Sequence, residues 1–261
     1  MNRQEKEKFE RLAHDQKPGP FPFVRIDELR RDHALIDTPT GRDWDPRWNR
    51  GTVQNLALKY FPNKNGALAD HGALYGRFLR FMQRAGYTNL YAMDFFDGIT
   101  EADRAALKGI HEVDYWSEPI PYPDNYFDYA TGWGFPEHLE NPHFFVREVH
   151  RTLKMGGIFI CSFPNIEALA TRLVLLKTGE LRNYEAHNNH IMPYPPGIFA
   201  KTYMRYFDVV EKTYMRPHLS LPPYWLFRII SKYLPNNKFF GDHTVMVLRK
   251  KPFIPYVQLT P

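Results

Sequence analysis

Three expected strands that are each followed by an aspartate, the third of them weakly marked, constrain the fold of this chain more than any other feature. They are residues 67–69, 89–93 and 111–113, followed by Asp70, Asp94 and Asp114. Apolar residues at helical spacing separate the segments, for example in residues 75–85. Strands that alternate with helices form right-handed β-α-β units, so an α/β fold is expected, with a parallel sheet and helices on both faces.

The second half of the chain continues this pattern. Asn141 suits the N-cap of a helix that Pro142 would open, and the glycine pair at 156–157 would end it. Residues 158–163 are apolar almost throughout, as expected of a central strand covered on both faces. We also expect strands at 126–131, 209–214 and 244–248, and helices at 50–60, 101–107 and 221–234.

The three strand-end aspartates predict a binding edge. Ligands of open α/β sheets bind at the carboxyl ends of the strands. Asp70, Asp94 and Asp114 would therefore place three carboxylates along that edge. One such aspartate is most often merely solvated, whereas three at equivalent places favour a ligand site.

Length and charge limit the class of protein. The 261 residues, 43% of them apolar, suffice for one large domain with an appendage. We expect an N-terminal arm or lid at 1–60 and a main domain at 61–261, with a lid insertion at 178–205. The net charge of +5 is spread over both termini without a basic stripe, so nucleic-acid binding is not expected.

Cysteine usage and hydropathy favour a cytoplasmic protein. Cys161 is the single cysteine, so neither an intrachain disulfide nor a cysteine-based zinc site is expected. No apolar run reaches the roughly 18 residues of a membrane span, and the N-terminus is charged. The amphipathic, aromatic segment at 221–233 most often would pack on the sheet or on a second subunit of a homodimer. Peripheral contact with a membrane is the alternative.

Four motifs between residues 120 and 165 resemble those of class I S-adenosylmethionine-dependent methyltransferases that act on small molecules. Residues 120–128 read IPYPDNYFD, where that family commonly has LPFPDNSFD. Residues 137–142 read EHLENP against EHLxxP, and residues 147–157 read REVHRTLKMGG against RExxRxLKPGG. Residues 162–165, SFPN, match the segment after the fifth strand. The resemblance implies a Rossmann-like, seven-stranded, mostly parallel sheet with an antiparallel last strand, and S-adenosylmethionine as cofactor.

The cofactor loop of that family usually reads acidic-x-Gly-x-Gly-x-Gly. Residues 70–76 correspond to it and read DHGALYG. Gly72 and Gly76 match, whereas Leu74 stands where the middle glycine is usual. Glycine suits such a loop because it adopts positive φ and allows close approach of a ligand. The leucine either blocks the cleft or is accommodated by a shifted loop.

The resemblance also assigns roles to the strand-end residues. Asp70 would lie near the methionine portion of the cofactor, and Asp94 would accept hydrogen bonds from the ribose hydroxyls. Asp114 would meet the adenine amine, and Tyr115 or Trp116 would stack near the adenine ring.

Two histidines and a glutamate are the candidate catalytic residues. Glu137 and His138 follow the fourth expected strand, beside the place where acceptors enter in that family. Histidine can accept a proton near neutral pH, so His138 is a candidate general base, with Glu137 and His190 as further candidates. His187 and His190 could ligate a metal ion if Glu137 joined them, but a polar lid with no metal is expected.

The expected function is methyl transfer to an oxygen of a small molecule, such as a sugar or glycan precursor. The alternative is a catalytically inactive member of the fold that serves as a binding or assembly module. Leu74, the WGFP stretch at 133–136 and the aromatic, proline-rich arms favour that alternative.

Overall fold

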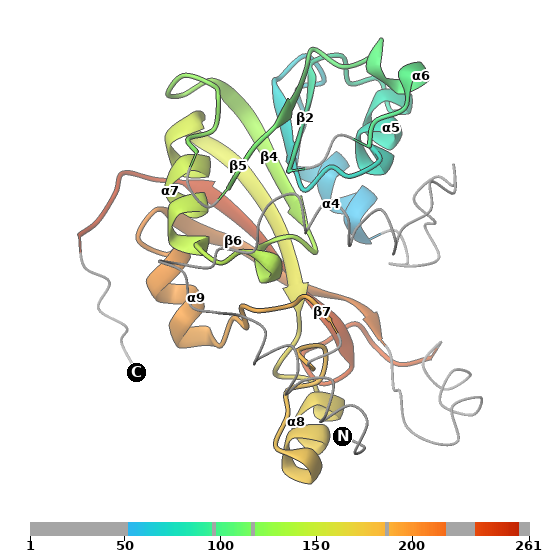
Figure 1. The fold of residues 1–261 in the computed structure, drawn as a ribbon, viewed down its shortest axis with the longest axis vertical. Coiled ribbons are helices and arrows are strands. Elements are labelled where there is room, and N and C mark those ends of the chain that lie inside the picture. The colour runs from blue at the N-terminus through green and yellow to red at the C-terminus, as the bar shows by residue number, and fades with distance from the viewer. Residues whose placement is uncertain (1–51, 96–97, 116–117, 186–187, 218–232, 256–261) are drawn as a thin grey trace, which may run out of the picture. The chain divides into compact units, whose positions relative to one another are not determined.

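A seven-stranded sheet forms the centre of the protein (Figure 1). The computed structural model describes residues 52–95, 98–115, 118–185, 188–217 and 233–255. The sheet has the order β3-β2-β1-β4-β5-β7-β6. Its strands are β1 (Leu68–His71), β2 (Leu90–Asp94), β3 (Gly109–Glu112), β4 (Phe127–Trp133), β5 (Leu153–Pro164), β6 (Phe207–Pro217) and β7 (Gly241–Lys250).

Only β7 runs against its neighbours in this sheet. It pairs antiparallel with β5 and with β6, whereas the pairs among β1 to β5 are all parallel. The expectation of a mostly parallel, Rossmann-like sheet with an antiparallel last strand is therefore confirmed.

Helices cover both faces of the sheet, as the alternating strands predicted. The helices are α4 (Thr52–Tyr60), α5 (Arg77–Arg84), α6 (Glu101–Arg104), α7 (Pro142–Thr152), α8 (Leu169–Thr178) and α9 (Pro196–Tyr203), and a 3-10 helix η1 spans Pro136–His138. Successive residues of β5 point to opposite faces, as strand geometry requires. Phe159 packs in one apolar cluster with α7 and α9, and Ile160 packs in another with α4 and α5. Figure 1 shows α7 and α9 on one side of the sheet and α5 on the other.

The start of α7 agrees with its sequence signals, but its end does not. The Asn141 side chain accepts a hydrogen bond of 3.1 Å from the Phe144 backbone N–H, which is the expected cap. The helix ends at Thr152, four residues before Gly156, and β5 begins at the next residue. Gly156 has φ of 77° and lies within β5, so the glycine pair shapes the strand and does not stop the helix.

The expected lid segment at 178–205 and the residues before it contain two helices that the sequence did not predict. α8 and α9 were not expected, because α8 exposes several leucines and lacks a clear apolar stripe, and α9 is opened by a proline pair. Arg182, which follows α8, forms an ion pair of 2.9 Å with Asp242 of β7. The segment is thereby fastened to the antiparallel strand.

α4 lies within the N-terminal arm expected at 1–60, yet it buries Val53, Leu56 and Ala57 in the core of the unit that contains the sheet. Most of the N-terminal arm and the segment at 221–232 lie outside the described residues. In the part of the chain that is described, no helix has both the length and the apolar character to cross a membrane.

Candidate active site

Two carboxylates lie side by side where β1 and β2 end. Asp70 and Asp94 are 3% and 4% exposed. The Thr131 hydroxyl of β4 donates a hydrogen bond of 2.7 Å to Asp70. Burial raises the pKa of Asp70 to about 7, against the effect of that hydrogen bond and with a contribution from the nearby Asp94 charge. Asp70 is therefore shielded from solvent near the end of β1.

The loop after β1 keeps the backbone shape of a glycine-rich loop. Gly72, Leu74 and Gly76 all have positive φ, of 74°, 46° and 68°. The backbone N–H of Leu74 donates a hydrogen bond of 2.8 Å to Asp94 Oδ2. Leucine is thus held in a left-handed conformation that L-residues adopt at a cost of about 1–2 kcal/mol. The loop shape survives the loss of the middle glycine.

Phe135 covers the first glycine of this loop. A Cβ atom on Gly72 would overlap the Phe135 ring, so only glycine fits at that position. Phe135 is buried and lies two residues beyond β4. Its ring therefore occupies the space beside the loop that a side chain at Gly72 would otherwise fill.

The structure places Tyr115 inside the core. It is 2% exposed, and its hydroxyl and His71 Nδ1 are hydrogen bonded at 3.0 Å. Its ring packs edge-on against Phe135 and Phe145. Asp114 immediately before it is partly buried, and Trp116 lies outside the described residues. Burial also lowers the pKa of His71 to about 3, so this imidazole is neutral.

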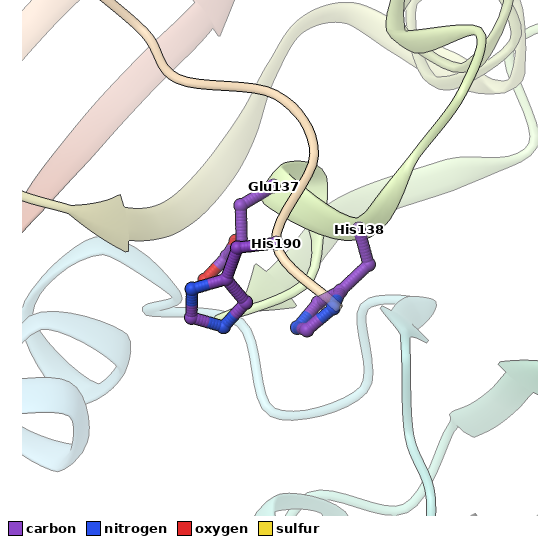
Figure 2. Close-up of side chains that lie close together, drawn as sticks. All are labelled: Glu137, His138 and His190. Carbon is purple, nitrogen blue, oxygen red and sulfur yellow. The ribbon is translucent and has the colours of Figure 1, made fainter. Parts of the chain in front are cut away.

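Glu137, His138 and His190 meet beside the end of β4, and we call them the Glu-His-His cluster (Figure 2). One potential ligand atom from each side chain lies within 4.8 Å of the other two. The His138 and His190 rings lie edge-to-face with centroids 4.6 Å apart. The backbone N–H groups of Ile191 and Met192 donate to the Glu137 carbonyl oxygen at 2.8 and 2.9 Å, which brings the lid segment to η1.

Burial controls the charge of this cluster. It raises the pKa of Glu137 to about 8, and the Oε2 atom has no hydrogen-bond partner among the described residues. Burial lowers the pKa of His190, although the Asn183 carbonyl oxygen, which accepts from Nδ1 at 2.6 Å, opposes that change. The structure brings His138 next to His190, a contact that the sequence did not predict. His187 lies outside the described residues.

An apolar cavity of about 220 Å³ lies at the end of β5. Tyr194 lines it and donates a hydrogen bond of 2.9 Å to the Pro136 carbonyl oxygen, next to Glu137. Its walls come from the end of β5, from α9 and from β6 and β7, and include Phe163, Asn165, Phe199, Lys212 and Met246. Sequence reasoning missed this cavity because only residues 163–165 of its wall belong to a motif, and most of the other wall residues are distant in the chain.

Part of the motif set is structural. The Arg151 guanidinium donates to the carbonyl oxygens of Ile120 and Tyr122, each at 2.8 Å, and pairs with Glu148 at 2.7 Å. Glu148 in turn accepts from the Ile120 backbone N–H at 2.9 Å. These two motif residues therefore hold the loop that leads into β4, away from the strand-end carboxylates.

Comparison with known proteins agrees with this geometry. Residues 69–161 match the family model described as "Methyltransferase domain". The chain has the fold of an S-adenosylmethionine-dependent methyltransferase from Mesorhizobium loti, with a TM-score of 0.51 at 16% identity over 77% of this chain and 99% of the other. Residues 69–161 thus form a methyltransferase domain, and the chain has the class I, Rossmann-like fold. The family recognised from the four motifs is thereby confirmed.

Curated relatives of this methyltransferase domain are similar over part of their length. Demethylmenaquinone methyltransferase of Listeria welshimeri is 30% identical over 140 residues, which are 49% of this chain and 53% of that protein. The chain spans about half the length of the curated relatives it matches. The solved cyclase SpnF also shares the fold, with a TM-score of 0.61 at 14% identity over 89% of this chain and 99% of the other.

The cofactor that this methyltransferase domain implies is S-adenosylmethionine. The residues at the carboxyl edge fit it in two respects. The loop at 72–76 keeps positive φ at three positions, and Asp94 presents a carboxylate beside that loop. The loop and Asp94 were expected at the cofactor. The importance of Thr131 and Phe135 was not expected, since it depends on β4 lying next to β1.

Proposed function

We propose that this chain transfers a methyl group from S-adenosylmethionine to a hydroxyl oxygen of a small molecule, with a sugar or glycan precursor as the class of acceptor. The observation that carries the proposal is the 2.8 Å hydrogen bond from the Leu74 N–H to Asp94. It supports cofactor binding because the loop and the strand-end carboxylate stand together although the middle glycine is absent.

One set of residues would bind the cofactor, and another set would bind the acceptor. S-adenosylmethionine supplies an electrophilic methyl group when it is bound. The backbone at 72–76 and Asp94 would hold it, while Asp70 supports the end of β1 from behind. Asp114 remains a candidate contact for the adenine amine. Holding the methyl donor and acceptor oxygen in line supplies most of the rate in such a transfer, so positioning is the main task of these residues.

The acceptor side would lie at the Glu-His-His cluster and the cavity at the end of β5. His138 Nδ1 donates to the Asn189 carbonyl oxygen at 3.2 Å, so in the neutral form of this ring the lone pair is on Nε2. That nitrogen is suited to take the proton of an acceptor hydroxyl. The polar side chains of the lid segment suit a hydroxyl-rich acceptor, and the apolar cavity would take a less polar part of the same molecule.

A second candidate function is binding without catalysis. The Phe135 ring against Gly72 favours it, because that ring fills space beside the cofactor loop. The likeness to the cyclase SpnF, which concerns the fold alone, illustrates that this fold is not restricted to methyl transfer. In that case the chain would serve as a binding or assembly module.

Calorimetric titration of the full chain with S-adenosylhomocysteine separates the two functions. We expect saturable binding of one ligand per chain. The absence of binding at millimolar ligand would rule out the methyltransferase proposal and favour the function as a binding module.

The acceptor class needs a separate assay. Transfer of a labelled methyl group is measured onto sugar nucleotides, onto free sugars and onto demethylmenaquinone, which the curated relatives' name supplies as a comparison. We expect label on a sugar compound. Label on demethylmenaquinone alone would support methyl transfer by this chain but would reject a sugar or glycan precursor as its acceptor.

A further inference from the structure

We propose that the Glu-His-His cluster is a binding site for a divalent transition metal ion, with zinc as the first choice. Glu137, His138 and His190 supply two imidazole nitrogens and a carboxylate oxygen, all within 4.8 Å of one another. Two histidines and one carboxylate are a set that zinc and ferrous iron accept with positions left open. The site rests on this geometry and does not depend on whether the chain transfers methyl groups.

The distances lie within reach of real coordination. Zinc takes histidine nitrogen and carboxylate oxygen at about 2.0–2.2 Å. Atoms at most 4.8 Å apart need to move toward a common centre by less than about 1 Å each, which side-chain rotations supply. Figure 2 shows the three side chains converging from η1 and from the lid segment.

Both imidazoles are already oriented as metal ligands are. Histidines that bind a metal usually donate their other ring N–H to a carboxylate, a backbone carbonyl or water. His138 Nδ1 donates to the Asn189 carbonyl oxygen at 3.2 Å, and His190 Nδ1 donates to the Asn183 carbonyl oxygen at 2.6 Å. When each ring is in its neutral form, the lone pair is therefore on Nε2, the nitrogen that would bind the ion.

The carboxylate provides an independent indication. Glu137 is 1% exposed, and its Oε2 atom has no hydrogen-bond partner among the described residues. A buried carboxylate oxygen without a partner is costly, and a cation is one way to satisfy it. Its backbone carbonyl oxygen accepts from Ile191 and Met192, which fixes the glutamate to the segment that carries His190.

The ligand set also determines which ions fit. Imidazole nitrogen suits zinc, iron, nickel and copper, whereas magnesium and calcium prefer oxygen donors. Three protein ligands leave a fourth position, which is typical of a site that also receives a water or substrate oxygen. With an ion bound, the His138 lone pair is committed to it, and methyl transfer would proceed without a histidine base.

Cobalt(II) absorption tests the site on the full chain after chelator treatment and dialysis. We expect one Co²⁺ per chain with visible d–d bands, and displacement of Co²⁺ by Zn²⁺. Glu137→Gln and His190→Asn should each weaken binding about tenfold or more. The matched control is His143→Asn, at an exposed position of α7, which should bind as the unmodified chain does.

Two results would overturn the site. One is the absence of Co²⁺ and Zn²⁺ binding up to 1 mM, and the other is equal affinity in all three variants. Because a variant can misfold, X-ray absorption at the zinc edge of the unmodified chain gives a second reading, for which we expect two imidazoles and no sulfur. Metal-free and metal-loaded protein are also titrated with S-adenosylhomocysteine. This titration reports cofactor binding separately from metal binding, so a failure of one is not mistaken for a failure of the other.

Discussion

The backbone N–H of Leu74 lies 2.8 Å from Asp94 Oδ2 and donates a hydrogen bond to it. This bond joins the loop after β1 to the end of β2, the two elements that would hold the cofactor. A leucine at φ of 46° is thus accommodated by its backbone, and the carboxylate is fixed in place. Substitutions of Leu74 and Asp94 can therefore test whether the altered loop binds the cofactor.

Replacing the Asp94 charge should weaken cofactor binding. Asp94→Asn keeps the shape and an oxygen that can accept from Leu74, but it removes the negative charge. A hydrogen bond to a charged group contributes about 1.5–3 kcal/mol, so affinity for S-adenosylhomocysteine should fall roughly 10- to 100-fold. Calorimetry measures this. Asp208→Asn, at an exposed position of β6, is the control. Unchanged affinity in Asp94→Asn would remove Asp94 from the site.

The strands and their acidic ends could be predicted because both signals are local. An apolar run followed by aspartate marks a strand end wherever the sheet later forms, and Asp70 and Asp94 are found there. The N-cap at Asn141 is equally local. The fold class followed from such signals and from the four motifs.

Contacts between distant segments could not be predicted in the same way. Phe135 meets Gly72 because β4 pairs with β1, a pairing that no motif encodes. His190 meets His138 because backbone bonds from the lid segment reach Glu137, whereas sequence spacing alone paired His190 with His187. Tyr115 was expected at the cofactor, and its burial follows from packing against Phe135.

Backbone strain at Leu74 predicts different effects of two small substitutions. Leu74→Ala removes most of the side chain but keeps the cost of positive φ, whereas Leu74→Gly removes both. The glycine variant should therefore be more stable than the alanine variant by about 1 kcal/mol in the free energy of unfolding, since the left-handed conformation costs L-residues about that much. Urea denaturation gives the difference. An alanine variant as stable as the glycine variant would mean that the loop adopts another conformation in solution.

Stability of the cofactor-free protein should depend on the protonation of Asp70. Its pKa is about 7 in the folded protein against an ordinary value of 3.8. Between about pH 4 and pH 7 the folded state keeps a proton that the unfolded state has lost. The contribution of Asp70 to the free energy of unfolding should therefore be largest below about pH 4 and fall as the pH rises to 7, by at most about 1.4 kcal/mol per pH unit.

The variant Asp70→Asn isolates this effect. It cannot titrate, so its stability relative to the unmodified chain should increase steadily from pH 4 to pH 7. Urea denaturation at several pH values measures the difference, and titration of other groups contributes equally to both proteins. Asp208→Asn serves as the exposed control. A constant difference between Asp70→Asn and the unmodified chain across that range would show that Asp70 is not buried in its neutral form.

Arg151 should prove irreplaceable by lysine, in contrast to the nearby Arg147. Arg151 donates from several nitrogens to Ile120, Tyr122 and Glu148 at once. Lysine carries the charge but cannot reproduce this planar set of donors. Arg151→Lys should therefore lower the free energy of unfolding by about 2 kcal/mol, because partly buried backbone oxygens lose their partners.

Arg147 is exposed on α7, where its guanidinium lies over the Phe144 ring at 5.9 Å. Arg147→Lys should change stability by less than about 0.5 kcal/mol, as surface substitutions usually do. Chemical denaturation of both variants gives the comparison. Equal losses in the two would contradict a structural role for Arg151. A loss confined to Arg151→Lys, with S-adenosylhomocysteine affinity unchanged in the folded variant, would place this motif residue in the scaffold that leads into β4.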